Sequence, residues 1–170
     1  MPQIERSALV FYSARQMFEL VNDVPRYPEF LPGCAKAEIL QQSADQMLAK
    51  LQVKKAGISQ EFTTRNTLEP THRIRMRLEE GGFSHLHGEW VFHALAEEAC
   101  KVSLNLDFEA NSLLSPAFAM GFQGLADRMV DDFCRQADRD EGELPRPHLA
   151  QQPDLGDADG VDRAQQGRAQ

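Results

Sequence analysis

A run of alternating apolar and polar residues between positions 47 and 110 constrains the fold more than any other feature of this chain. In its clearest segment, from Cys100 to Glu109, every second residue is apolar and the residues between them are polar. This period places apolar side chains on one face of a strand and polar side chains on the other. The strand-like segments follow one another without a helical pattern between them. The sequence therefore predicts an antiparallel sheet with one buried face.

A long helix is expected after the last strand. Between Phe118 and Phe133 an apolar residue recurs every three or four positions, which is the spacing of one helix face, while charged residues including Asp132 are expected on the other face. Ser115 is the expected N-cap, and Ser13 is the expected N-cap of a shorter helix near the N-terminus. The sequence thus predicts an α+β fold with a long C-terminal helix against a sheet of six or seven strands.

Composition separates a domain from a tail. Residues 141–170 contain no aromatic residue but three prolines and four glycines, so we expect a globular domain over residues 1–140 and a disordered acidic tail over residues 141–170.

The net charge of −8 disfavours non-specific binding to nucleic acid. Three cysteines without a CxxC pair, and the lack of an apolar segment long enough to be a signal peptide or a membrane span, predict a cytoplasmic protein.

Histidines and arginines cluster on the polar faces of two predicted strands. His85, His87 and His93 share one such face, and the His-x-His spacing can bind zinc. Because Trp90 lies on the opposite, apolar face, we interpret the histidines as solvent-exposed and assign no metal site.

A row of arginines occupies the polar face of the strand before it, and Arg65 is expected to approach this row across a hairpin. Such a row is most often a solvated strand face. The alternative is contact with nucleic-acid phosphates or with an anionic membrane surface. The residues assigned to this surface are Arg65, Arg73, Arg75 and Arg77.

The segment FELVNDVPRYPEFLPGC, from Phe18 to Cys34, resembles the opening motif of the coenzyme Q-binding and ribosome-association toxin A (RatA) family of the START-like superfamily. Shorter similarities include EFTT at residues 61–64, FSHLHGEWVF at residues 83–92 and FEANSLL at residues 108–114, so the resemblance extends over about residues 3–138. It implies a helix-grip fold, in which a curved antiparallel sheet wraps around the C-terminal helix and leaves an apolar cavity.

The resemblance implies a hydrophobic ligand in that cavity. An isoprenoid such as ubiquinone would be held mainly by buried apolar area, at about 0.8 kcal/mol for each CH₂ group. We expect Gly121 and Gly124 in the helix, and Gly88 beside Trp90, to leave space for it. The proline-rich loop after position 25 is expected to act as a lid at the rim or to pack onto the core as a plug. The residues assigned to ligand binding are Tyr27, Phe30, Leu31, Trp90, Phe92, Leu104, Leu106, Phe108, Phe118, Phe122, Leu125 and Met129.

The family suggests two main functions. In the hypothesis favoured by the sequence, the protein is a non-enzymatic carrier or chaperone of ubiquinone or a related isoprenoid, supports respiration and requires no cofactor. In the alternative, it is a RatA-type toxin that binds the large ribosomal subunit and blocks subunit association. This resemblance implies that the arginine row contacts ribosomal RNA phosphates. We expect a cytoplasmic monomer. The carrier hypothesis implies that it contacts the surface of the inner membrane transiently, as a peripheral protein.

A polyketide cyclase is the enzymatic alternative, because some START-like proteins have that activity. Its candidate acids and bases, Glu61, Arg65 and Glu109, are expected on the outer face of the sheet, away from a cavity. The chain also lacks the GxxxxGK[ST], GxGxxG and HExxH motifs. We therefore assign no catalytic residue.

Overall fold

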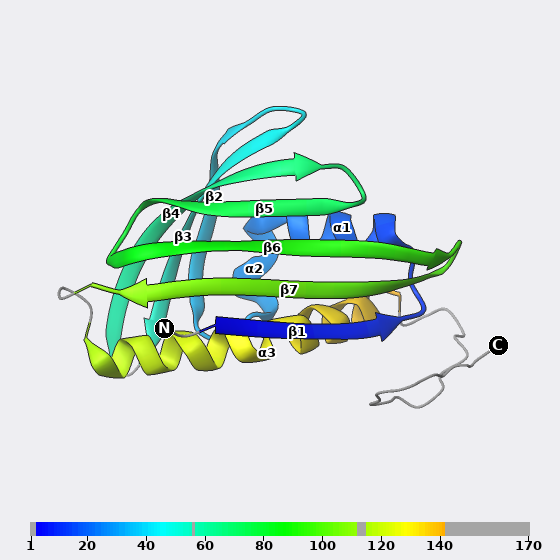
Figure 1. Cartoon of the computed structure of the whole chain (residues 1–170). Helices are drawn as coiled ribbons and strands as arrows, with labels where there is room; N and C mark the ends of the chain where they lie inside the picture. The colour runs from blue at the N-terminus through cyan, green and yellow to red at the C-terminus, as the bar shows by residue number, and fades with distance from the viewer. Residues whose placement is uncertain (1–2, 56, 112–114, 142–170) are drawn as a thin grey trace.

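A seven-stranded antiparallel sheet, with the strand order β1-β7-β6-β5-β4-β3-β2, forms most of the fold (Figure 1). The computed structural model describes residues 3–55, 57–111 and 115–141. Consecutive strands from β2 to β7 are neighbours, as the short connections predict, while β1 pairs with β7 at one edge. The strands are β1 (Gln3–Val10), β2 (Cys34–Gln42), β3 (Gln46–Lys55), β4 (Ile58–Glu69), β5 (Arg73–Glu80), β6 (Phe83–Ala96) and β7 (Ala99–Ala110).

The helices begin at the caps that the sequence predicts. The Ser13 hydroxyl accepts a hydrogen bond from the backbone N–H of Gln16 at 3.0 Å, and the Gln16 side chain accepts one from the Ser13 N–H at 2.7 Å, a reciprocal capping box. The Ser115 hydroxyl likewise accepts from the N–H of Phe118 at 3.0 Å. The helical segments are α1 (Ala14–Asn22), the 3-10 turn η1 (Val24–Arg26), α2 (Tyr27–Phe30) and α3 (Pro116–Asp140).

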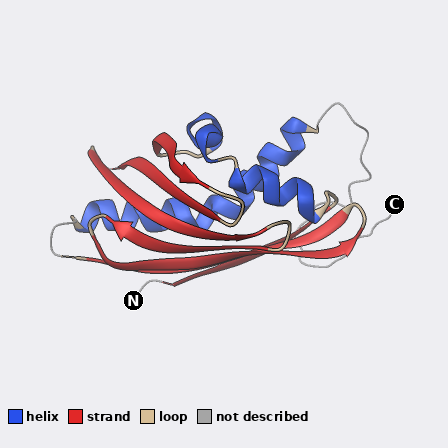
Figure 2. Ribbon diagram, turned by 90° about the horizontal axis from the view of Figure 1, so that it is seen from above, coloured by secondary structure: helices blue, strands red, loops and turns tan. Residues whose placement is uncertain are grey.

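All three α-helices lie on the same side of the curved sheet (Figure 2). The inner face of the sheet and the facing side of α3 form the core, in which Trp90, Phe108, Phe118 and Phe133 are fully buried. The predicted α+β architecture, with its antiparallel sheet and long C-terminal helix, is confirmed. Within the described residues, no helix combines the length and the apolar character needed to span a membrane.

The helical pattern was wrong about one charged residue. Asp132, expected on the outer face of α3, is buried, and its Oδ1 accepts a hydrogen bond from Nη2 of Arg135 at 2.9 Å. Arg135, one turn further along the helix, therefore compensates the negative charge of the buried Asp132 carboxylate. Apart from Glu141, which caps α3, the predicted disordered tail lies outside the described residues.

Candidate functional site

The twelve residues assigned to ligand binding come together in the layer between the sheet and the helices. All are buried except Phe30 and Met129, which are partly buried against the same core. Their alternation along β6 and β7 and their helical spacing along α3 place them there. The structure thus confirms their location, while the apolar cavity and the ligand stay predictions.

An aromatic cluster that the sequence analysis identified only in part occupies one end of this layer. The ring of Phe122 on α3 lies 5.7 Å from that of Phe62, 5.0 Å from that of Phe83 and 4.9 Å from that of Phe108, measured between centroids. Phe62 and Phe83 were not assigned to the ligand site, although each lies in a segment of alternating apolar and polar residues. Because aromatic rings at these distances attract one another, the cluster stabilises the contact between α3 and the sheet.

The proline-rich loop after position 25, which contains α2, packs onto the core, as the plug interpretation expects. The rings of Tyr27 and Phe30 each lie 5.3 Å from the ring of Phe133 on α3. The hydroxyl of Tyr27 donates a hydrogen bond to the backbone carbonyl of Val21, and burial raises the pKa of Tyr27 above its usual range. Leu31 is also buried. A lid function of this loop stays a prediction.

The space beside Gly121 is filled by a side chain from the sheet. A Cβ atom added at Gly121 would lie 2.7 Å from the Cβ of Lys55, and one added at Gly33 would lie 2.5 Å from the Cε of the same lysine. The aliphatic part of Lys55 therefore lies between α3 and the loop before β2, an arrangement typical of a lysine that buries its stem. The expectation that Gly121 leaves room for a ligand is wrong, because Lys55 occupies that room.

The other two glycines differ from each other. A Cβ at Gly88 would lie 2.7 Å from the backbone oxygen of Asn105 on the neighbouring strand, so Gly88 permits close strand pairing and does not widen a cavity. At Gly124 the closest atom outside the adjacent helix backbone would be 3.8 Å away, an ordinary contact distance. Of the three glycines, only Gly124 leaves space beside it.

Two polar side chains face inward from β4. Thr64 and Asn66 are buried, and the Thr64 hydroxyl donates a hydrogen bond to Oδ1 of Asn66 at 2.9 Å. They share the face of Phe62 and Leu68, since all four have the same parity along the strand. The sequence analysis did not assign them to the site. Their hydroxyl and amide groups could hydrogen-bond to the polar head group of a ligand.

The predicted arginine row lies on the outer face of the sheet, beside a groove of about 700 Å³ lined by residues of six strands. Arg65 and Arg77 are directly opposite each other on β4 and β5, so the predicted approach across the hairpin is confirmed. Thr67 and Arg75 form the next pair on the same face of the two strands. Three of the four arginines, Arg65, Arg75 and Arg77, line the groove.

Glutamates neutralise most of this arginine surface. Arg65 pairs with Glu79 at 3.3 Å, while Arg73 and Arg75 share Glu89 at 2.9 and 3.4 Å. No ion-pair partner is found for Arg77 among residues 3–55, 57–111 and 115–141. The surface is therefore a row of alternating charges in which Arg77 has an available guanidinium.

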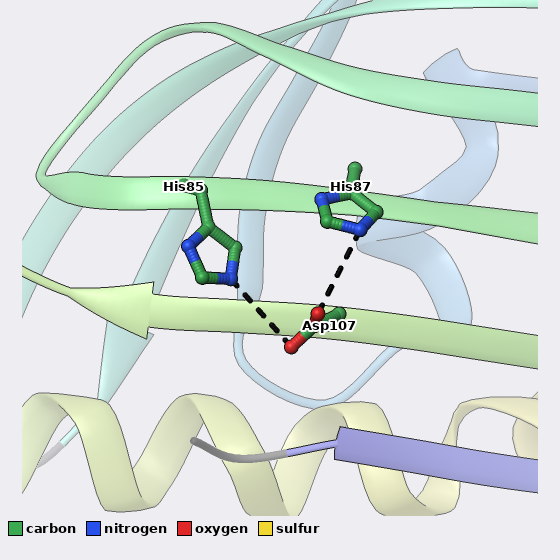
Figure 3. Close-up of side chains that lie close together, drawn as sticks. All are labelled: His85, His87 and Asp107. Carbon is green, nitrogen blue, oxygen red and sulfur yellow. Dashed lines mark ion pairs between the residues drawn. The ribbon is translucent and has the colours of Figure 1, made fainter.

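The histidines of β6 also lie on the outer face, and two of them converge on an aspartate of β7 (Figure 3). Nε2 of His85 is 3.5 Å from Oδ1 of Asp107, and Nε2 of His87 is 3.7 Å from Oδ2 of the same residue. His93 lies further along β6, opposite Lys101. The sequence analysis predicted this face but not the aspartate, because only the pairing of β6 with β7 brings Asp107 to the histidines.

The candidate acids and bases for an enzyme occupy the outer face as well. Glu61 and Glu109 are exposed, and Arg65 is half-buried. Two cysteines are buried, and burial raises the pKa of Cys34 to about 11 and that of Cys100 to about 12. Both thiols are therefore protonated near neutral pH and poor nucleophiles.

Comparison with known families agrees with this fold. Residues 10–134 match the family described as polyketide cyclase / dehydrase and lipid transport. The chain therefore belongs to this family.

Several individual proteins are similar to this chain over most of its length. It is 50% identical over 135 residues to a protein of Pseudomonas aeruginosa named ribosome association toxin RatA, covering 79% of this chain and 94% of that protein. It is 51% identical over 138 residues to the RatA protein of Escherichia coli K12, covering 81% of this chain and 87% of the relative. The mitochondrial coenzyme Q-binding protein COQ10 of Drosophila melanogaster is 26% identical over 142 residues, and the match covers 81% of this chain and 59% of that protein. The resemblance inferred from the opening motif is confirmed.

Solved structures show the same fold. The Zhui aromatase/cyclase of Streptomyces sp. R1128 superposes with a TM-score of 0.71 at 23% identity, over 81% of this chain and 94% of that chain. A START superfamily protein of Mycobacterium smegmatis gives a TM-score of 0.63 at 20% identity, over 83% of this chain and 97% of that chain. These similarities confirm the START-like fold.

Proposed function

We propose that this protein associates with the large ribosomal subunit and blocks its association with the small subunit. The observation that carries this proposal is the identity of about 50% to proteins named ribosome association toxin RatA, over 94% of the Pseudomonas aeruginosa relative. The identity to the COQ10 proteins is about half as high. The comparisons thus favour the hypothesis that the sequence analysis had placed second.

The arginine row on the outer face of β4 and β5 is the proposed contact with ribosomal RNA. A guanidinium can donate two parallel hydrogen bonds to one phosphate, and Arg77 has no competing carboxylate among the described residues. Arg73 and Arg75 share Glu89 and each also lies 4.0 Å from Glu69, so a phosphate would compete with two glutamates for these arginines. Because the chain as a whole has a net charge of −8, attraction to RNA must come from a local surface of this kind.

Sedimentation of the purified chain with separated ribosomal subunits tests this proposal. We expect the protein to pellet with the large subunit, and we expect Arg77→Glu to reduce the bound fraction without changing the far-UV circular dichroism spectrum. If Arg77 contacts a phosphate, the slope of log affinity against log salt should decrease by about one in this variant.

Arg15→Glu is the matched control for the charge reversal. Arg15 lies on α1, away from the arginine row, and its side chain is 75% exposed. This variant should bind like the original chain. If the original chain, Arg77→Glu and Arg15→Glu all bind equally well, the arginine row does not contact the ribosome. A chain that pellets with neither subunit would contradict the proposed function itself.

We propose hydrophobic ligand binding as a second candidate, with an isoprenoid such as ubiquinone as the ligand. It is supported by the family description, which includes lipid transport, and by the COQ10 relatives, which are named coenzyme Q-binding proteins. Lys55 fills the space beside Gly121, so a ligand at that position requires the lysine to move.

Mass spectrometry of an organic extract of the protein, purified from its native host, tests the second candidate. A mock purification is the control. A stoichiometric isoprenoid would support a carrier role, including transient contact with a membrane, and would be compatible with ribosome binding on the opposite face. An extract no different from the mock would contradict it.

A further inference from the structure

Three side chains on the outer face of the sheet are arranged as a set of metal ligands. His85 and His87 are two residues apart on β6 and therefore share a face, and Asp107 is directly opposite His87 on β7. Each histidine directs its Nε2 atom toward a different oxygen of the Asp107 carboxylate, at 3.5 and 3.7 Å (Figure 3). One ligand atom from each residue can be chosen so that all three lie within 4.8 Å of one another.

This spacing is close to what a metal ion needs. Ligand atoms of a tetrahedral zinc ion with bonds of 2.0–2.1 Å are roughly 3.4 Å apart. Small rotations of exposed side chains are enough to bring the three atoms to that separation, because both strands hold the backbone in register. The strand pairing has therefore already placed the three ligands.

One nitrogen of this group lacks a hydrogen bond. Nε2 of His85 is shielded from solvent and makes no hydrogen bond to any described residue, although it lies 3.5 Å from Oδ1 of Asp107. Buried polar atoms normally have a hydrogen-bond partner, and this nitrogen has only its approach to the carboxylate. A cation between the nitrogen and the carboxylate would satisfy both.

The second nitrogen of His85 also has the environment found in metal sites. Its Nδ1 lies 3.9 Å from Oε1 of Glu109, which is directly opposite His85 on β7. Histidine ligands of metals commonly direct their other ring nitrogen toward a carboxylate, which fixes the tautomer and the orientation of the ring. Glu109 can therefore hold His85 with Nε2 directed toward the metal.

We propose that His85, His87 and Asp107 bind a divalent zinc ion, with the fourth coordination position open toward the groove. Two imidazole nitrogens and one carboxylate suit zinc, whereas Mg²⁺ and Ca²⁺ prefer oxygen ligands throughout. His87 and Asp107 both line the groove, so water or an anionic ligand can reach the open position. This inference is independent of ribosome binding and concerns the isolated protein.

Zinc binding by the full chain without an affinity tag tests the proposal. Isothermal titration with Zn²⁺ should show one ion bound per chain, and excess Mg²⁺ should not compete. His85→Ala and Asp107→Asn should each weaken the affinity at least tenfold, while Glu109→Gln should weaken it by a smaller factor. Circular dichroism spectra would establish that each variant is folded.

His93→Ala is the matched control, because His93 lies on the same face of the same strand but is opposite Lys101. It should bind zinc like the original chain. Two results would overturn the proposal: a chain that binds no zinc, or a His85→Ala variant that binds it as tightly as His93→Ala does. In either case the three residues form only ion pairs on a solvated face.

Discussion

Phe133 on α3 contacts both the proline-rich loop and the sheet, and its replacement tests how much these contacts stabilise the fold. Its side chain is completely buried, and its ring lies 5.3 Å from the rings of Tyr27, Phe30 and Trp90, with edge-on or nearly edge-on geometry. Replacing a buried phenylalanine with alanine typically costs about 3–5 kcal/mol of unfolding free energy. Because three aromatic partners lose their contact together, we expect Phe133→Ala to lie in the upper half of that range.

Phe133→Leu separates ring contacts from buried volume. Leucine keeps much of the apolar area and removes the aromatic edges, so a loss of about 1–2 kcal/mol is expected. Urea unfolding followed by the fluorescence of Trp90, the chain's single tryptophan, measures both variants. Met120→Ala on the same helix is the control, since the Met120 side chain is exposed and its removal should change stability by less than about 0.5 kcal/mol. A loss below about 1 kcal/mol for Phe133→Ala would refute the packing described above.

Three further predictions follow from buried or paired groups. Gly121→Leu must displace the stem of Lys55 and should cost about 1–3 kcal/mol in urea unfolding; an unchanged stability would contradict the contact. Because burial raises the pKa of Cys100 to about 12, iodoacetamide at pH 8 should modify this thiol slowly in the folded protein and rapidly in urea, as mass spectrometry of its peptide can measure. The Arg26 guanidinium lowers the pKa of Asp140, so this pair stabilises the fold above the unfolded pKa of about 3.9 and loses its contribution as the pH falls through the lower folded value. Asp140→Asn should therefore cost about 0.5–1 kcal/mol near neutral pH and reduce the loss of stability on acidification, and identical acid profiles for the two proteins would contradict this.

Most of the fold was predictable because its signals are local. Alternation along β7 assigns each side chain to a face without knowledge of the neighbouring strands, and the serines that cap α1 and α3 act on backbone groups three residues away. The packing of the folded protein does not change which face a side chain of the strand occupies or which backbone group a serine caps. The order of β2 to β7 followed from the short connections between them, whereas the pairing of β1 with β7, far apart in the chain, did not.

The site was predictable only where it depends on parity. The alternating pattern places His85 and Arg65 on the outer face correctly, but Asp107 joins the histidines only through the register of β6 with β7. The position of Lys55 depends on a contact between β3 and α3, two elements far apart in the chain. A glycine in a sequence shows that a side chain is absent, and only the structure shows that Lys55 fills the space.

The burial of Asp132 has a similar origin. Helical periodicity assigns a residue to a face but does not state how wide the buried face is, which depends on how the sheet curves around α3 (Figure 2). The carboxylate at the margin of that face is enclosed and pairs with Arg135. Charge alone therefore predicted the wrong environment.

The formation of complete ribosomes from purified subunits, in the presence of this protein, tests the central claim most directly. Large and small subunits are mixed at a magnesium concentration that favours association and separated on a sucrose gradient. The account predicts that one equivalent of the chain per large subunit lowers the fraction of complete ribosomes and that the chain migrates with the free large subunit. An unchanged fraction at a large excess of the chain would contradict it.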